Sequence, residues 1–182
     1  MVDYLEIGLK SVVEPEHLAG LLAAQEPNAS EQELQSLSQT ISQLLGTIPA
    51  NIRLINAYIE HPLCRKPLGF AFGEVLRYCF DEKDLLPEQT FGALGLIDDA
   101  YLLQALSNLL PLYFPYAVPT KVEAVPFESR SVIENLLPEG VVTALDRTAH
   151  SILDVAVAMF GSGGQEGGND GDGVRLRIGS LV

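Results

Sequence analysis

The sequence predicts an all-α protein built as a single bundle of six or seven helices, with short extended segments at its two ends. Apolar residues recur at the spacing of one helix face in several separate stretches, and prolines or glycines stand between these stretches. With 182 residues, of which 47% are hydrophobic and 19% charged, the chain is long enough for one domain with a large core.

The first two helices are expected to form a hairpin. Residues 15–25 have helix-forming composition, and Pro27 breaks the chain after them. Ser30 and Glu33 have the spacing of a capping box, so a second helix should begin there. Its leucines and isoleucine fall on one face until Gly46 ends the helix.

Two further helices are predicted in the middle of the chain. One covers residues 50–61, with its isoleucines directed inward, and is closed by Pro62. The other covers residues 68–80 and is apolar along most of its length. Both are expected to contribute to the core.

The stretch from residue 100 to residue 120 has no formally charged side chain. A helix that begins near Asp98 and ends at Pro111 explains its first half, and further prolines then indicate an extended connection. We expect this helix to lie at the centre of the bundle. The alternative is that the run faces or enters a membrane, because its length would suffice for a bilayer.

The last core helix is expected over residues 141–160. Asp146, His150 and Asp154 follow one another at one-turn spacing on its polar face. A histidine beside an acid can be a general base with its orienting carboxylate, but a solvated helix face is built in the same way. No nucleophile stands at a recognisable spacing from this histidine.

The chain is therefore divided into a helical domain over residues 1–160, a linker and a tail. Residues 161–173 form a Gly-rich acidic linker that has too few apolar residues to fold by itself. In residues 174–182 apolar and basic residues alternate, which predicts an extended segment. We expect this tail to pair with the N-terminal segment or to bind a protein partner.

Eleven basic and 24 acidic residues give a formal charge of -13, which repels phosphate backbones, so we expect no nucleic-acid partner. Asp3 and Glu6 stand where a secretory signal would need basic and then uninterrupted apolar residues. A cytoplasmic location is predicted, with attachment to the inner face of the membrane as an alternative. Cys64 and Cys79 are expected to be reduced there.

An acidic segment leads into the uncharged run. It carries Asp84 and Glu88 on either side of Pro87, and then Asp98 and Asp99 at the start of the predicted helix. Acids in the first turn of a helix accept backbone N–H bonds and meet the positive end of the helix dipole. If the four carboxylates converge, they would instead form an oxygen-rich site for Mg²⁺ or Mn²⁺. They are the candidate metal ligands, and no other cofactor is expected.

This segment resembles the signature of the bacterial YkvA-like family, a domain of unknown function. The resemblance rests on DLLP at residues 84–87 and on GLIDDA at residues 95–100, followed by an apolar helix. It covers about thirty residues, within a YkvA-like segment of about residues 68–115. The resemblance implies a compact helical module, often associated with membranes, with no assigned reaction.

A second combination of metal-ligating side chains gives a weaker indication of a site. His61, Cys64 and Cys79 lack the paired spacing of zinc ligands, and a fourth ligand would have to come from a distant histidine. We therefore expect the two cysteines to be small core residues.

The leading interpretation is a non-enzymatic interaction or scaffold module, working in the cytoplasm or at a membrane surface. One alternative is a metal-dependent hydrolase that uses Asp84, Asp98 and Asp99. Another is a bundle that binds a small molecule or a lipid between its uncharged helices.

Overall fold

The computed structural model describes residues 14–25, 27–80, 92–120, 137 and 140–161. The all-α class is confirmed, because these residues are mostly helical and contain no strand. The predicted linker and extended tail lie almost entirely outside the described residues.

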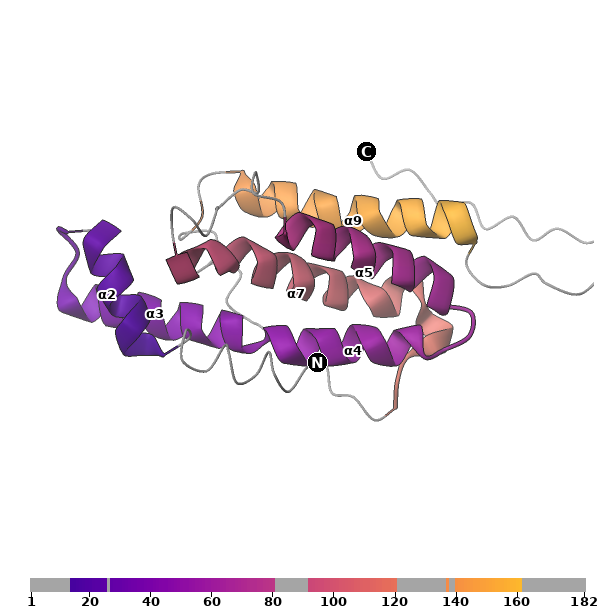
Figure 1. The fold of residues 1–182 in the computed structure, drawn as a ribbon, viewed down its shortest axis with the longest axis horizontal. Coiled ribbons are helices and arrows are strands. Elements are labelled where there is room, and N and C mark those ends of the chain that lie inside the picture. Colours follow the sequence, from indigo (N-terminus) through magenta and orange to yellow (C-terminus); the bar gives the residue numbers. More distant parts are fainter. Residues whose placement is uncertain (1–13, 26, 81–91, 121–136, 138–139, 162–182) are drawn as a thin grey trace, which may run out of the picture.

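Six α-helices and two short 3₁₀ helices make up the described part of the chain (Figure 1). In chain order they are α2 (Pro15–Gln25), α3 (Glu31–Gly46), α4 (Ile48–Ile59), α5 (Arg65–Cys79), η1 (Gly92–Gly95), α7 (Leu96–Tyr113), η2 (Pro115–Ala117) and α9 (Val141–Phe160).

Helix α7 is the centre of the bundle. It packs against α3, α4, α5 and α9, while α2 packs against α3 at one end of the molecule (Figure 1). Leu102, Leu106 and Leu110 of α7 are fully buried. The first part of the uncharged run, from Ala100 to Leu110, is therefore largely core, which explains its lack of charge without a bilayer.

No helix among the described residues is both long enough and apolar enough to cross a membrane.

The helical hairpin formed by α2 and α3 agrees with the expectation from the sequence. The capping box at the start of α3 is present: the Ser30 N–H donates to Glu33 Oε2 at 2.8 Å, and the Glu33 N–H donates to Ser30 Oγ at 3.3 Å. This reciprocal pair satisfies two backbone donors at the helix start, as its sequence spacing predicts.

The boundary between α3 and α4 differs from the prediction of a break over residues 46–49. Thr47 has the helical angles φ -79° and ψ -20°, and α4 begins at the next residue. Pro49 falls in the first turn of α4, where a backbone N–H has no acceptor within the helix, so the lack of an N–H in proline costs no helical hydrogen bond. The two helices therefore follow each other almost without interruption, nearly in line (Figure 1).

Two other boundaries also lie outside the predicted ranges. Helix α5 begins at Arg65, before the predicted range of 68–80, with Pro67 in its first turn. Helix α7 begins at Leu96, and it continues past Pro111 to Tyr113. A proline in the last turn of a helix removes one backbone bond there, and the helix can still complete its turn.

Candidate functional site

The acidic pair Asp98 and Asp99 lies in the first turn of α7, as predicted, but it is buried. Asp98 is 0% exposed and Asp99 is 5% exposed. From the last turn of α5, the Tyr78 hydroxyl donates a hydrogen bond of 2.8 Å to Asp98 Oδ2. The pair therefore belongs to the contact between α5 and α7.

Helix capping accounts for the position of these acids but not for their burial. The N-cap of α7 is Gly95, which has no side chain with which to accept a bond, so neither aspartate is the N-cap residue. In the first turn both carboxylates still lie near the positive end of the helix dipole. A capping role alone would leave such side chains in water, whereas these two are enclosed by the bundle.

The other two candidate metal ligands, Asp84 and Glu88, lie outside the described residues. Within the described part of the chain, no group of three or more His, Cys, Asp or Glu side chains is arranged to hold a metal ion. The described members of the predicted cluster are thus the two aspartates of α7.

The two cysteines are free thiols at opposite ends of α5. Cys64 precedes the first residue of this helix and Cys79 is its last residue, which separates them by about 22 Å at 1.5 Å per residue. The combination of His61, Cys64 and Cys79 considered for zinc is therefore not brought together. His61 Nδ1 does lie 3.9 Å from the Cys64 sulfur.

Both thiols are expected to be unreactive in the native protein. Burial raises the pKa of Cys64. Burial and then the nearby Asp99 carboxylate raise the pKa of Cys79 well above its usual range. Because the thiolate is the reactive form, iodoacetamide at neutral pH should modify both residues slowly in the folded protein and rapidly in urea, as followed by mass spectrometry. Fast native modification of Cys79 would contradict its partial burial beside the acidic pair.

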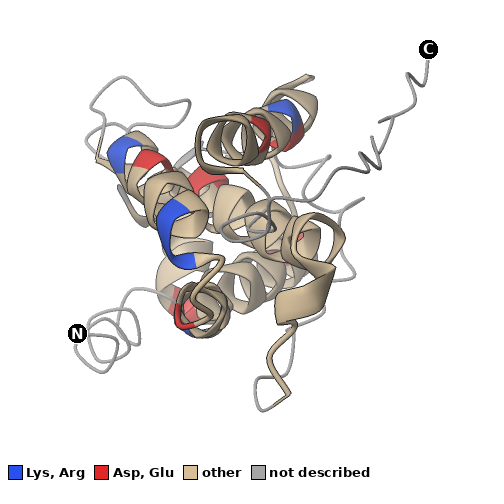
Figure 2. Ribbon diagram, turned by 90° about the vertical axis from the view of Figure 1, so that its right-hand side faces the viewer, with Lys and Arg blue, Asp and Glu red and all other residues tan. Residues whose placement is uncertain are grey.

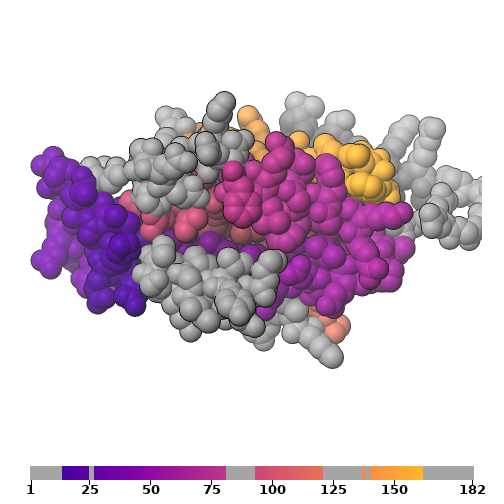
Figure 3. Space-filling model, viewed as in Figure 1, coloured from indigo at the N-terminus to yellow at the C-terminus, as the bar shows by residue number. Residues whose placement is uncertain are grey.

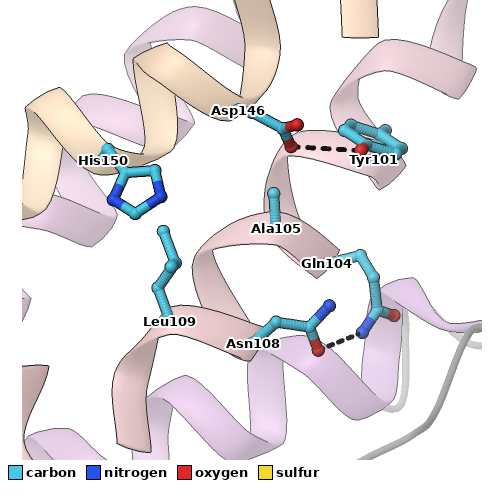
Figure 4. A pocket seen from close by; sticks show the side chains of 7 residues that line it. All are labelled: Tyr101, Gln104, Ala105, Asn108, Leu109, Asp146 and His150. Carbon is cyan, nitrogen blue, oxygen red and sulfur yellow. Dashed lines mark hydrogen bonds between the residues drawn. The ribbon is translucent and has the colours of Figure 1, made fainter. Parts of the chain in front are cut away.

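A pocket of about 360 Å³ lies between α7 and α9 (Figure 4). It brings together polar groups that are far apart in the sequence. The lining residues are Tyr101, Gln104, Ala105, Asn108, Leu109, Asp146 and His150.

The polar face of α9 is ordered by tyrosines of α7. The Tyr101 hydroxyl donates to Asp146 Oδ1 at 3.1 Å, and the Tyr113 hydroxyl donates to Asp154 Oδ1 at 2.7 Å. His150 Nδ1 lies 3.3 Å from the Tyr113 oxygen. The sequence predicts that His150 lies beside its two acids. It does not predict the contacts of Tyr101 and Tyr113, because these tyrosines belong to a mostly apolar run.

A chain of amides runs from the buried Asn51 of α4 through the buried Gln104 to Asn108, which is exposed at the pocket. Asn51 Nδ2 donates to Gln104 Oε1 at 3.0 Å, and Gln104 Nε2 donates to Asn108 Oδ1 at 3.0 Å. Asn51 Nδ2 also lies 3.2 Å from the Thr47 hydroxyl oxygen, at the junction of α3 and α4. The only sequence signal for this chain was the presence of polar residues inside an apolar helix.

One end of the bundle exposes large apolar side chains, and we call it the apolar end. There the carboxyl ends of α7 and α9 meet the connection between α4 and α5 (Figure 1). The His61 and Tyr116 rings lie 5.7 Å apart, and the Phe70 and Phe160 rings lie 5.9 Å apart, which joins these elements. The exposed residues of the apolar end are Leu63, Leu112, Tyr116, Val118, Met159 and Phe160.

Charge is sparse at the apolar end. Helix α7 has no charged residue after Asp99, and α9 has none after Asp154. Arg65 and Lys66 are exposed at the start of α5, beside the apolar side chains, and Glu60 is the acid at the end of α4. In Figure 2, which faces this end, most of the nearest ribbon is uncharged. The space-filling view in Figure 3 shows the ends of α5 and α9 together at the surface.

Comparisons of the sequence with protein-family models and with curated proteins, and of the fold with solved structures, found no match.

Proposed function

We propose that the protein is a non-enzymatic helical interaction module that works as a peripheral membrane protein at the cytoplasmic face. The observation that carries this proposal is the apolar end, where the α4–α5 connection, α7, the η2 segment and α9 together expose six large apolar side chains. Large apolar side chains exposed near one another are typical of a surface that binds a membrane or a partner.

The composition of the apolar end suits a lipid surface. Aliphatic residues and phenylalanine can enter the acyl boundary, while tyrosine and basic residues suit the headgroup layer. The tyrosine at the apolar end is Tyr116, and the basic residues are Arg65 and Lys66. Among the described residues at this end, Arg65 and Lys66 outnumber Glu60, whereas the whole chain has a charge of -13 and would otherwise be repelled by anionic lipids.

The resemblance of the segment around Asp98 and Asp99 to the YkvA-like family supports the same proposal, since that resemblance implies a module often associated with membranes. In this proposal the acidic pair belongs to the fold of the module rather than to a reaction. The Cys79 thiol beside the pair, whose pKa is raised by burial and by Asp99, offers no ready thiolate nucleophile, which also favours a non-enzymatic role.

The proposal is tested by flotation with phosphatidylcholine vesicles, with and without phosphatidylserine. We expect the protein to float with both, and we expect Met159→Glu combined with Phe160→Glu to reduce the bound fraction at least tenfold, since each buried apolar side chain contributes about 1.5–3 kcal/mol. The matched control is Phe80→Glu, because Phe80 is 83% exposed at the end of α5 away from the apolar end. This variant should float like the unchanged protein.

Failure of the unchanged protein to float would overturn membrane docking, as would an equal loss in the Phe80→Glu variant. If instead the protein is a dimer in gel filtration and the Met159→Glu, Phe160→Glu variant is a monomer, the apolar end is an interface between two copies of this chain.

A further inference from the structure

We propose that the pocket between α7 and α9 binds a small aliphatic cation and recognises its primary ammonium group. This inference goes beyond membrane docking, because the pocket shares no residue with the apolar end. A volume of about 360 Å³ is within the range of small-molecule sites.

The first element of recognition is Asp146, on the α9 wall of the pocket. The Tyr101 hydroxyl donates to one of its oxygens and so holds the carboxylate in place. A carboxylate can accept several hydrogen bonds at once, and its bonds to an ammonium group are short and strong. Asp146 is the formally charged carboxylate among the described lining residues, and its negative charge attracts a cation.

The second element is His150, whose proton arrangement follows from its neighbours. Tyr113 has one hydroxyl hydrogen, which it donates to Asp154 at 2.7 Å. Burial and this bond raise the pKa of Tyr113 to about 12, so the hydrogen is retained. The 3.3 Å contact between the Tyr113 oxygen and His150 Nδ1 is then a bond donated by the imidazole. In the neutral ring this leaves Nε2 as an acceptor, on the same helix face as the Asp146 carboxylate.

The opposite wall comes from α7 and is held rigidly. Gln104 is 4% exposed and is fixed between Asn51 of α4 and Asn108. The Asn108 oxygen accepts the Gln104 bond, which orients this side chain at the pocket. Ala105 and Leu109 supply an apolar surface for a short alkyl chain. Polar groups fixed by neighbouring side chains bind with little loss of rotamer freedom.

The experiment uses n-butylamine as the probe, with n-butanol and butyrate as neutral and anionic ligands of the same chain length. Binding is followed at about pH 8, where imidazole side chains are ordinarily neutral, through the backbone amide resonances of the full chain. We expect n-butylamine to shift the amides of Ala105, Asn108 and Leu109 in a saturable manner. The neutral and anionic ligands should bind at least tenfold more weakly.

Asp146→Asn should weaken n-butylamine binding about tenfold, because the charge-assisted bond is lost while the shape is kept. Glu60→Gln is the matched control, since it removes the same charge outside the pocket, and it should leave the affinity unchanged. Ala105→Leu fills the pocket from its α7 wall and should abolish binding. This variant keeps the test decisive if Asp146→Asn does not fold. Absence of saturable shifts, or an equal loss in Glu60→Gln, would overturn the proposal.

Discussion

Replacement of Leu102 by alanine is expected to lower the free energy of unfolding by about 2–5 kcal/mol. Leu102 is fully buried in α7, the helix against which the main elements of the bundle pack. The substitution removes apolar contacts and leaves a cavity, because a helix contacted on several sides cannot move to fill it. Urea denaturation followed by circular dichroism measures the change.

Leu112→Ala provides the control for this prediction. It is the same chemical change in the same helix, but Leu112 is 74% exposed at the apolar end. We expect a change within about 0.5 kcal/mol in solution without vesicles. Similar losses for Leu102 and Leu112 would mean that α7 is not the central helix of the bundle.

Loss of the hydrogen bond between Tyr78 and Asp98 has the second large expected effect. Tyr78→Phe and Asp98→Ala should each destabilise the protein by about 1–3 kcal/mol, because each leaves a group that was hydrogen-bonded in a buried setting. The double variant should cost less than the sum of the two single variants, since the two substitutions remove the same bond. Chemical denaturation of all four proteins gives this coupling energy.

The bond between Tyr113 and Asp154 is the matched control. It joins the same two kinds of side chain at 2.7 Å, but in an exposed setting. Water can replace the lost partner there, so Tyr113→Phe should lower the free energy of unfolding by much less than Tyr78→Phe does. Equal losses at the two sites would show that the acidic pair is accessible to water.

Thermal melts with and without divalent ions separate the structural role of the acidic pair from the metal-dependent alternative. A divalent ion at about 100 times its Kd would stabilise the fold by about 2.7 kcal/mol. A stabilisation of this size by Mg²⁺ or Mn²⁺, absent in EDTA and in the Asp98→Asn, Asp99→Asn double variant, would make the pair part of a metal site and would support the hydrolase hypothesis. With the pair as a buried element of the fold, melting temperatures in EDTA and in Mg²⁺ should agree.

The sequence predicts the local features of this fold well. The capping box of Ser30 and Glu33 depends on residues three apart, so the start of α3 can be located from sequence alone. The run without charges also identifies the core helix, because a helix surrounded by other helices carries few charged side chains. The end of α3 at Gly46 was predicted, but α4 begins at Ile48 rather than after Pro49, because only packing decides whether the chain resumes its helix at once.

The candidate sites depend on contacts between distant residues, and these could not be predicted. The spacing of Asp98 and Asp99 indicates only a helix start, while their burial depends on the packing of α5 twenty residues earlier. The pocket requires Gln104 to lie opposite Asp146, which is determined by how α7 and α9 pack. Polar residues in an otherwise apolar helix were the available hint, because buried amides persist where they have partners.

The amide pair of Asn51 and Gln104 has a consequence for the alignment of the bundle. Leucine and isoleucine faces are similar at every turn, so α4 could slide along α7 by one turn, about 5.4 Å, and still bury apolar surface. Such a slide would part the two amides and leave them among apolar side chains, at a cost of about 1–3 kcal/mol for each unpaired group. One polar contact in the core therefore selects a single register for the two helices.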